Sequence, residues 1–418
     1  MASKSKRIVS LDIGTSKVQV VVADVLSDGQ SPLRIHVVAV GRAPSRGLRK
    51  GVVIHIDGTI ASIGEAIGQA ESMIGSSITK VVASVSGAHV QSFNSHGIVG
   101  IREGEVSKLD VEKVIEAARA VAIPHDRVVL HVLPQGFVVD KQDAIRNPLG
   151  ISGVRLESRV HIVSCSSSGS HNVVKSANKC GLSVDKTVLA PLSSAWAVLT
   201  PEEQELGACL LDIGGGTCGI VVFQNGAVLH SAVLPIGGNH ITNDIAAGLR
   251  TPIAAAEEIK KDFGTVSVQQ VNPMDTIEVP STGGRSPRVL SRSILAEIIE
   301  PRVRELFHLV AANLRENGVS LHTLSSGLVL TGGTSHLQGI CELGEEVFSA
   351  PVRSGGITDH SGHKITGLFD LVAGPDSSAA IGGIICTTKG REGELFHPES
   401  GKFSGMLRRV GAWMAEHF

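Results

Sequence analysis

The sequence predicts an α/β protein built from two duplicated domains that face each other across a cleft. The chain has 418 residues, a length typical of two or three domains. Residues 8–22 and 208–222 form an internal repeat, IVSLDIGTSKVQVVV and ACLLDIGGGTCGIVV, in which Leu-Asp-Ile-Gly recurs 200 positions later. In each copy an apolar strand ends in aspartate, a turn of glycine, threonine or serine follows, and a second strand begins. Asn225-Gly226 after the second copy is a strong signal for a β-hairpin.

The composition is that of a folded protein and excludes several classes of function. Hydrophobic residues make up 42% of the chain and charged residues 19%, which excludes a disordered or fibrous protein. The formal net charge is only −2, so we expect no nucleic acid among the partners. The 48 glycines indicate places where the backbone must approach another group closely.

Neither the amino terminus nor the cysteines indicate export or a zinc site. The apolar run after the basic residues 4–7 breaks at Asp12, too early for a signal peptide, and no apolar stretch of about 18 residues follows. The six cysteines form no C-x-x-C pair, and the 17 histidines join no Cys/His cluster. We therefore expect a cytosolic chain with free thiols, without protein-bound zinc and without a membrane span.

The two Asp-Ile-Gly turns are candidate phosphate-binding loops. Glycine lets backbone N–H groups approach a phosphate, and Asp12 and Asp212 can hold a hydrated Mg²⁺ between protein and phosphates. Lys17 can reach the terminal phosphates as a point charge. The alternative is that both segments are only tight turns at strand ends. Their recurrence at matching points favours phosphate binding.

The second copy also matches the pattern G-x-G-x-x-G, through Gly214, Gly216 and Gly219. A dinucleotide-binding fold requires a helix after these glycines, whereas the residues that follow predict a strand and a hairpin. We therefore reject a dinucleotide-binding fold.

A third glycine turn follows the apolar strand at 327–331. Gly332, Gly333 and Thr334 lead into a helix that we expect from about Leu337, an arrangement suited to contact with a base and ribose. Elsewhere, Glu257 and Lys260 lie three residues apart on one helix face. Taken alone, this pair is more simply a solvated ion pair.

In this order, the two Asp-Ile-Gly turns, the helix of Glu257 and Lys260 and the Thr-Gly-Gly turn resemble the superfamily of actin, Hsp70 and sugar-kinase ATPases. Five more specific segments resemble the FtsA family of bacterial cell-division proteins over residues 6–386. The resemblance implies an actin-like duplicated ATPase fold, two domains each with a subdomain flanking a nucleotide cleft, and a C-terminal amphipathic helix. These five segments are Pro44–Gly47, His131–Gln135, Gly150–Val154, Gly283–Arg288 and Leu295–Arg302.

The resemblance also implies ATP and Mg²⁺ as ligands and assigns their contacts. Glu257 and Lys260 are now expected near the base or ribose, and Asp12 and Asp212 near Mg²⁺ through water. The first phosphate loop comprises Asp12, Gly14, Thr15, Ser16 and Lys17; the second comprises Asp212, Gly214, Gly215, Gly216 and Thr217; and Gly332, Gly333 and Thr334 lie by the adenosine.

One departure bears on hydrolysis. Relatives with strong ATPase activity often carry an aspartate where this chain has Gly219. That carboxylate can help to order metal or water, so we expect slow or absent turnover of ATP.

The domain organisation follows from the same resemblance. Within the inserted subdomain, residues 108–122 predict a helix with an apolar stripe, and Ser107 and Asp110 predict a capping box. The implied divisions are residues 1–84, 162–197 and 360–386 for the first core, 85–161 for the inserted subdomain, 198–235 and 319–359 for the second core, 236–318 for the second subdomain, 387–402 for a flexible linker and 403–418 for a membrane-targeting helix.

The tail has the pattern of an amphipathic helix that lies on an anionic membrane surface. Its apolar residues recur at spacings of three and four, and two arginines flank them. Its 16 residues span only about 24 Å as a helix, too short to cross a bilayer. The alternative is a terminal helix packed on the protein's own core. The residues expected to meet lipid are Phe403, Met406, Leu407, Arg408, Arg409, Val410, Trp413, Met414 and Phe418.

A basic stretch flanks a Gly-Ser-Pro loop within the second subdomain. A solvated surface is the simpler interpretation of its arginines. The resemblance implies that this part of the chain receives the C-terminal peptide of FtsZ, the tubulin-like division protein. The candidate contacts are Arg285, Arg288, Arg292 and Arg302.

The resemblance thus implies an ATP-binding protein that polymerises with itself on the cytoplasmic face of the inner membrane at the division site. It would anchor FtsZ filaments there and help to recruit later division proteins. A sugar- or acetate-type kinase on the same fold is the alternative, but it leaves the terminal helix without a role. An Hsp70-like chaperone fails because no substrate domain follows.

Overall fold

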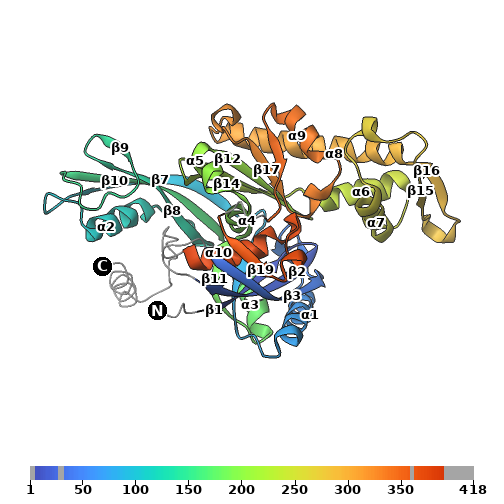
Figure 1. The fold of residues 1–418 in the computed structure, drawn as a ribbon, viewed down its shortest axis with the longest axis horizontal. Coiled ribbons are helices and arrows are strands. Elements are labelled where there is room, and N and C mark those ends of the chain that lie inside the picture. Colours follow the sequence, from blue (N-terminus) through green and yellow to red (C-terminus); the bar gives the residue numbers. More distant parts are fainter. Residues whose placement is uncertain (1–4, 27–32, 358–361, 390–418) are drawn as a thin grey trace.

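Two β-sheets with equivalent strand orders form the centre of the protein (Figure 1). The second sheet, read from β18 to β14, corresponds to the first read from β11 to β3, and the first has the additional strand β19. The computed structural model describes residues 5–26, 33–357 and 362–389. The first sheet has the order β11-β6-β1-β2-β3-β19 and the second the order β14-β13-β12-β17-β18. The strands are β1 (Lys6–Ile13), β2 (Lys17–Leu26), β3 (Arg34–Pro44), β6 (Lys80–Val85), β11 (Ser183–Leu189) and β19 (Lys364–Gly367), and then β12 (Ala208–Ile213), β13 (Cys218–Gln224), β14 (Ala227–Leu234), β17 (Leu328–Thr331) and β18 (Val352–Ser354).

The two sheets repeat each other in pairing and in register. Each opens with three antiparallel strands, and in each the first of these also pairs with a parallel strand, β6 or β17. Asp12 lies opposite Gln19 in the first sheet, and Asp212 lies opposite Gly219 in the second. The duplicated α/β fold predicted from the internal repeat is therefore confirmed.

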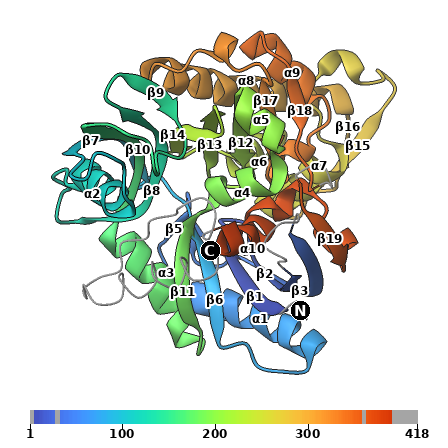
Figure 2. The same ribbon diagram turned by 60° about the vertical axis from the view of Figure 1, so that its left-hand side comes forward.

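Two helices, α4 (Ala190–Val198) and α10 (Ser378–Lys389), lie between the sheets (Figures 1 and 2). α10 packs on α4, β1 and β6, and α4 packs on β12 and β13. Every residue of α4 is buried, as expected for a helix that is covered on all sides. A single hydrophobic core therefore joins the two halves. It contains Leu11 of the first sheet, Leu192 of α4 and Leu210 of the second sheet.

Helices also cover the outer faces of both sheets. α1 (Ile56–Ile74) packs on β2 and β3, and α3 (Ser167–Lys179) packs on α1 and β11. The outer face of the second sheet has its own core, in which the rings of Phe307 and Phe348 lie 5.0 Å apart. The remaining elements are α5 (Pro201–Leu206), α6 (Gly238–Leu249), α7 (Ile253–Phe263), α8 (Arg292–Glu316) and α9 (Ile340–Phe348), with the short strands β4 (Leu48–Arg49), β5 (Val52–Val53), β15 (Thr276–Val279) and β16 (Arg288–Ser291).

The segment between β6 and α3 forms a separate four-stranded sheet with its own core (Figure 2). One edge of this unit contacts β14 of the second half. There, Ser92 Oγ donates to the carbonyl of Ser231 at 2.5 Å, and Gln135 Nε2 donates to that of Val228 at 2.9 Å. The unit is thus inserted into the first half of the chain but packs on the second. Its elements are β7 (Gln91–Gly100), α2 (Lys108–Arg119), β8 (Arg127–Val139), β9 (Gln142–Ile145) and β10 (Arg155–Ser166).

The predicted capping box at the start of α2 is confirmed. Asp110 N–H donates to Ser107 Oγ, and Ser107 N–H donates to the Asp110 carboxylate. The helix ends at Arg119 rather than at 122, and Val121 is 42% exposed. Pro124 disfavours the helical conformation only at Ile123, the residue directly before it.

Two other predicted boundaries need correction. α10 continues to Lys389, into the stretch 387–402 expected as a linker. Within this extension, the hydroxyls of Thr387 and Thr388 donate to carbonyls of the preceding turn. The helix expected from about Leu337 begins at Ile340. Gly339 precedes it with φ +82°, a left-handed conformation that keeps the helix from starting earlier.

The six cysteines are free, as expected, and are buried or half-buried. None of the helices within residues 5–26, 33–357 and 362–389 combines the length and apolarity needed to cross a bilayer. The amphipathic tail predicted for 403–418 lies outside the described residues.

The close packing of α10 on α4 can be tested with glycine substitutions. A β carbon on Gly382 would lie 1.8 Å from the carbonyl oxygen of Ser193, whereas one on Gly68 in α1 would meet nothing within 4 Å. We expect Gly382→Ala to lower the free energy of unfolding by about 2 kcal/mol. Gly68→Ala, the matched control, should raise it by about 0.5 to 1 kcal/mol. Urea unfolding measures both, and equal effects would contradict the packing.

Candidate functional site

The two Asp-Ile-Gly turns, one from each half of the chain, are in direct contact. A β carbon on Gly215 would lie 1.9 Å from Ser16 Oγ, and one on Gly216 would lie 2.6 Å from Thr15 Oγ1. Glycine permits this approach without strain, whereas a side chain here would displace Ser16 or Thr15 of the opposite loop. The structure therefore brings together the two predicted phosphate loops, which are about 200 residues apart in sequence.

Each turn carries a carboxylate at the end of its strand. Ser84 Oγ donates to Asp12, and Ser194 Oγ donates to Asp212 at 2.7 Å. Burial raises the pKa of Asp12. Burial, together with the negative charge of Asp12, raises the pKa of Asp212 to about 6. The two carboxylates thus repel each other, and a cation between them would relieve this repulsion.

This arrangement fits a magnesium ion that is held through water. Among residues 5–26, 33–357 and 362–389, no three His, Cys, Asp or Glu side chains gather into a set that could hold a metal. Mg²⁺ usually keeps several waters and binds through one or two carboxylates plus phosphate oxygens. Asp12 and Asp212 supply the two carboxylates that this coordination needs.

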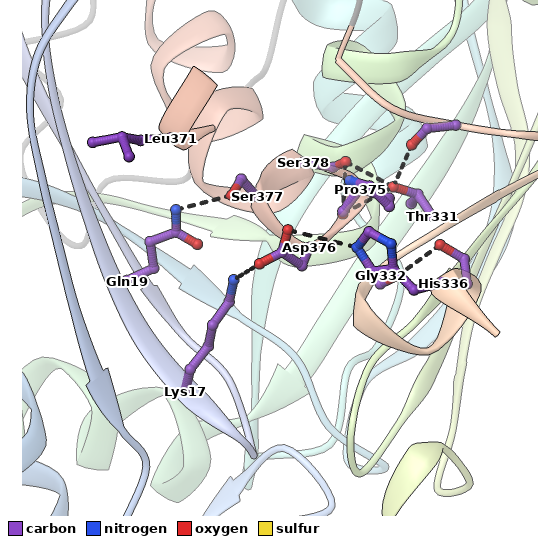
Figure 3. Close-up of polar contacts among 12 residues, drawn as sticks. Lys17, Gln19, Thr331, Gly332, His336, Leu371, Pro375, Asp376, Ser377 and Ser378 are labelled. Carbon is purple, nitrogen blue, oxygen red and sulfur yellow. Dashed lines mark hydrogen bonds and ion pairs between the residues drawn. The ribbon is translucent and has the colours of Figure 1, made fainter. Parts of the chain in front are cut away.

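Lys17, at the first position of β2, forms an ion pair with Asp376 (Figure 3). Burial lowers the pKa of Lys17, while Asp376 and Asp12 oppose this effect. Asp376 belongs to the short 3₁₀ turn Pro375–Ser377 that precedes α10. No pattern in the chain indicated Asp376, because this residue lies 359 positions from Lys17 and matches no motif.

The third glycine turn lies directly against the second phosphate loop. Gly332 has φ +83°, and a β carbon there would lie 2.5 Å from Asp212 Oδ1. Thr334 Oγ1 donates to the carbonyl of Gly214 at 3.0 Å. The predicted adenosine turn and the predicted phosphate loop therefore form one continuous surface.

Lys260 and Glu257 form an ion pair that is largely buried rather than solvated. Lys260 Nζ lies 2.6 Å from Glu257 Oε2, and its side chain is only 10% exposed. It also donates to the carbonyl of Gly238 at 3.2 Å and to Thr242 Oγ1 at 2.9 Å. Burial lowers the pKa of Lys260, and Glu257 opposes this effect. The pair reaches the cleft at Gly238, where a β carbon would lie 2.5 Å from Thr334 Oγ1.

The start of α6 supports the second loop, and sequence reasoning missed it. Gly238 N–H donates to the carbonyl of Gly214 at 2.9 Å, and Asn239 N–H donates to that of Gly215 at 2.7 Å. The signal available was the pair Gly237-Gly238, three residues after the end of a predicted strand. These bonds use the carbonyls of Gly214 and Gly215 and fix the second loop to the start of α6.

Comparisons with known proteins agree with this geometry. The sequence model "Cell division protein FtsA" matches residues 209–382, and the model "SHS2 domain inserted in FTSA" matches residues 87–164. Cell division protein FtsA of Pseudomonas aeruginosa is 50% identical over 377 residues, which cover 90% of this chain and 88% of the relative. The FtsA of Neisseria meningitidis serogroup B is 42% identical over the whole of both chains.

The chain belongs to the FtsA family of cell-division proteins.

Solved structures show that this FtsA-family chain has an actin-like fold. The PilM–PilN type IV pilus biogenesis complex matches with a TM-score of 0.63 and 18% identity, over 91% of this chain and 98% of that chain. MreB5 of Spiroplasma citri bound to ADP matches with a TM-score of 0.52 and 14% identity, over 92% and 96%. The MamK double helical filament matches with a TM-score of 0.51 and 12% identity, over 91% and 98%.

The four arginines predicted to receive a peptide do not form a single group. Arg288 donates to the carbonyl of Leu249, and Arg292 donates to that of Phe263 at 2.9 Å. Arg302 lies about 15 Å further along α8 and holds Asp244 of α6 through two hydrogen bonds. Arg285 lies near the β15–β16 hairpin and is exposed.

The raised pKa of Asp212 predicts that this carboxylate destabilises the nucleotide-free protein. The pKa of Asp212 is about 6 in the folded protein against the ordinary 3.8. The ionised carboxylate therefore lowers the free energy of unfolding increasingly as pH rises from 4 to 6, and the loss is complete above pH 6. We expect Asp212→Asn to raise the free energy of unfolding at pH 7.5 by about 1 to 3 kcal/mol.

Urea unfolding at pH 7.5 and pH 4.5 checks this prediction, and the gain should shrink at the lower pH. Asp24→Asn is the control. Arg7 lowers the pKa of Asp24, so removal of the Asp24 carboxylate should not raise the free energy of unfolding. Equal stability of wild type and Asp212→Asn at pH 7.5 would contradict the assignment.

Proposed function

We propose that this FtsA-family chain binds ATP and Mg²⁺ in its cleft and acts as a division scaffold with slow or absent ATP turnover. The observation that carries the proposal is the direct contact of the two Asp-Ile-Gly turns, each of which has a buried carboxylate at the end of its strand. A triphosphate with a divalent cation supplies the positive charge that Asp12 and Asp212 need and the anionic oxygens that suit Lys17.

Each predicted contact has a role in this proposal. The backbone of Gly14, Thr15 and Ser16 binds phosphate from one side, and that of residues 214–217 binds it from the other. Gly332, Gly333 and Thr334 lie along the adenosine, with Glu257 and Lys260 near the base or ribose. Mg²⁺, when bound, neutralises phosphate charge, and Asp12 and Asp212 orient its waters.

We attribute slow turnover to the contact between Gly219 and Pro191. Gly219 lies opposite Asp212, at the position where relatives with strong ATPase activity often carry an aspartate. A β carbon there would lie 2.0 Å from Pro191 Cγ, so the proline ring occupies the space that a carboxylate would need. Pro191 precedes Ser194, the partner of Asp212, by one turn of α4. An apolar ring thus takes the place of a group that can order water.

A double substitution tests this explanation. Wild type should bind MgATP and hydrolyse it slowly; turnover of several ATP per second would refute the proposal. Gly219→Asp alone should lose about 1 to 3 kcal/mol of stability through overpacking. Pro191→Gly with Gly219→Asp should fold and hydrolyse about 10-fold faster or more, as a positioned acid or base permits. Pro191→Gly alone is the control and should not accelerate hydrolysis.

The partners that we propose follow from family membership and from the tail. The filament of MamK, which shares the fold, supports self-association of this chain. Residues 403–418 are proposed to lie on the cytoplasmic face of the membrane. The subdomain at 236–318 is proposed to receive the FtsZ peptide, with Arg285, Arg288 and Arg292 as contacts and Arg302 as a tie between α8 and α6. Later division proteins would then join this assembly.

Removal of the tail separates membrane binding from nucleotide binding. A chain without residues 403–418 should lose sedimentation with vesicles that contain anionic lipid, because the apolar face and the arginines are both gone. Its affinity for MgATP should stay within about 2-fold of that of the full chain. Retained sedimentation would contradict the proposed anchor. Recruitment of an FtsZ tail peptide to vesicles, measured on the full chain, tests the tether.

A further inference from the structure

The residues Gly374–Ser378, hereafter the bridging segment, connect the two halves at the cleft (Figure 3). Ser377 Oγ accepts from Gln19 Nε2 and from Arg42 Nη2 of the first half, both at 3.0 Å. The segment directly precedes α10, which packs against β1 and β6.

The same segment is bound to the second half through the strand that leads into the adenosine turn. Thr331 Oγ1 lies 2.7 Å from Ser378 Oγ and donates to the carbonyl of Pro375 at 3.1 Å. Gly332 N–H donates to that carbonyl at 3.0 Å. A displacement of the bridging segment would therefore change contacts with both halves and the position of the start of α10.

Asp376 is the only acidic residue of the bridging segment, and its carboxylate is directed at Lys17. The two side chains are 28% and 31% exposed, so water screens the pair only in part. Burial would raise the pKa of Asp376, but Lys17, together with Arg42 and His336, lowers it. His336 Nε2 lies 3.9 Å from Asp376 Oδ1. Asp376 is thus an ionised group in contact with the lysine proposed for the terminal phosphates.

A carboxylate and a terminal phosphate compete for the same ammonium group. Lysine offers three donors on a compact charge, and a second anion close to a first raises the free energy of both. A nucleoside diphosphate has one phosphate fewer and therefore less charge to bring to this position. The competition should for this reason be stronger for ATP than for ADP.

We propose that Asp376 is an internal counterion of Lys17 that a nucleoside triphosphate displaces and a nucleoside diphosphate leaves in place. The inference rests on the proposed binding of nucleotide in the cleft. Asp376 lies two residues before α10, so its release loosens the bridging segment at the point where both halves hold it. The chain thereby senses the third phosphate by charge exchange, without hydrolysis.

The variant Asp376→Asn removes the competing charge and keeps the size of the side chain. In titration calorimetry with the full chain and Mg²⁺, we expect its affinity for ATP to rise about 3- to 10-fold, as loss of one nearby like charge predicts, and its affinity for ADP to change less. Asp376→Glu keeps the charge and should keep the wild-type ratio of ATP to ADP affinity. Glu205→Gln, which removes an acid paired with the distant Arg146, is the matched control.

Hydrogen exchange provides a second readout that does not depend on affinity. In wild type, ATP but not ADP should speed exchange of the amides at 374–378. In folded Asp376→Asn, these amides should exchange faster already without nucleotide.

Two results would contradict the inference. One refutes the inference alone, and the other refutes the proposed function as well. If wild type binds nucleotide but Asp376→Asn leaves the ratio of ATP to ADP affinity unchanged, the inference alone is wrong. If wild type binds neither nucleotide, the proposed function is wrong and the inference goes with it.

Discussion

The contact between two glycine loops is the constraint on which the rest of the site depends. Gly215 and Gly216 lie so close to Ser16 and Thr15 that a side chain added to either glycine would force the opposite side chain to move. This contact brings together two strand ends, each with a buried carboxylate. Burial is the main cause of the raised pKa of Asp212, and the negative charge of Asp12 adds to it, so the site favours a cation.

The packing between the sheets keeps the two loops in this position. α4 and α10 share one core with both halves, so the loops rest on a common support rather than on two independent domains. The same helices also bring polar groups to the cleft. Ser194 of α4 holds Asp212, and Asp376 before α10 holds Lys17. The inserted unit adds a further tie, since it contacts β14 of the second half.

Much of the fold and of the site could be predicted from local patterns in the chain. The internal repeat predicted two matching sheets, and the turns containing Asp12, Asp212 and Gly332 are adjacent as expected. Helix ends were less predictable, because single residues such as Gly339 act over one or two positions. Partners outside the motifs were not predictable. Asp376 and Pro191 have no pattern of their own, and their contacts exist only in the folded chain.

The sequence by itself determined the duplicated α/β fold, the residue types of the glycine turns and the resemblance to the FtsA family. These are local or repetitive features, set by side-chain period and by backbone freedom. Only the tertiary structure decided which charges meet. Lys17 lies beside Asp376, Lys260 is buried against α6, and Pro191 fills the space next to Gly219. The reason is physical: the energy of a charge or of a close contact depends on distance in space, and the chain order does not contain that distance.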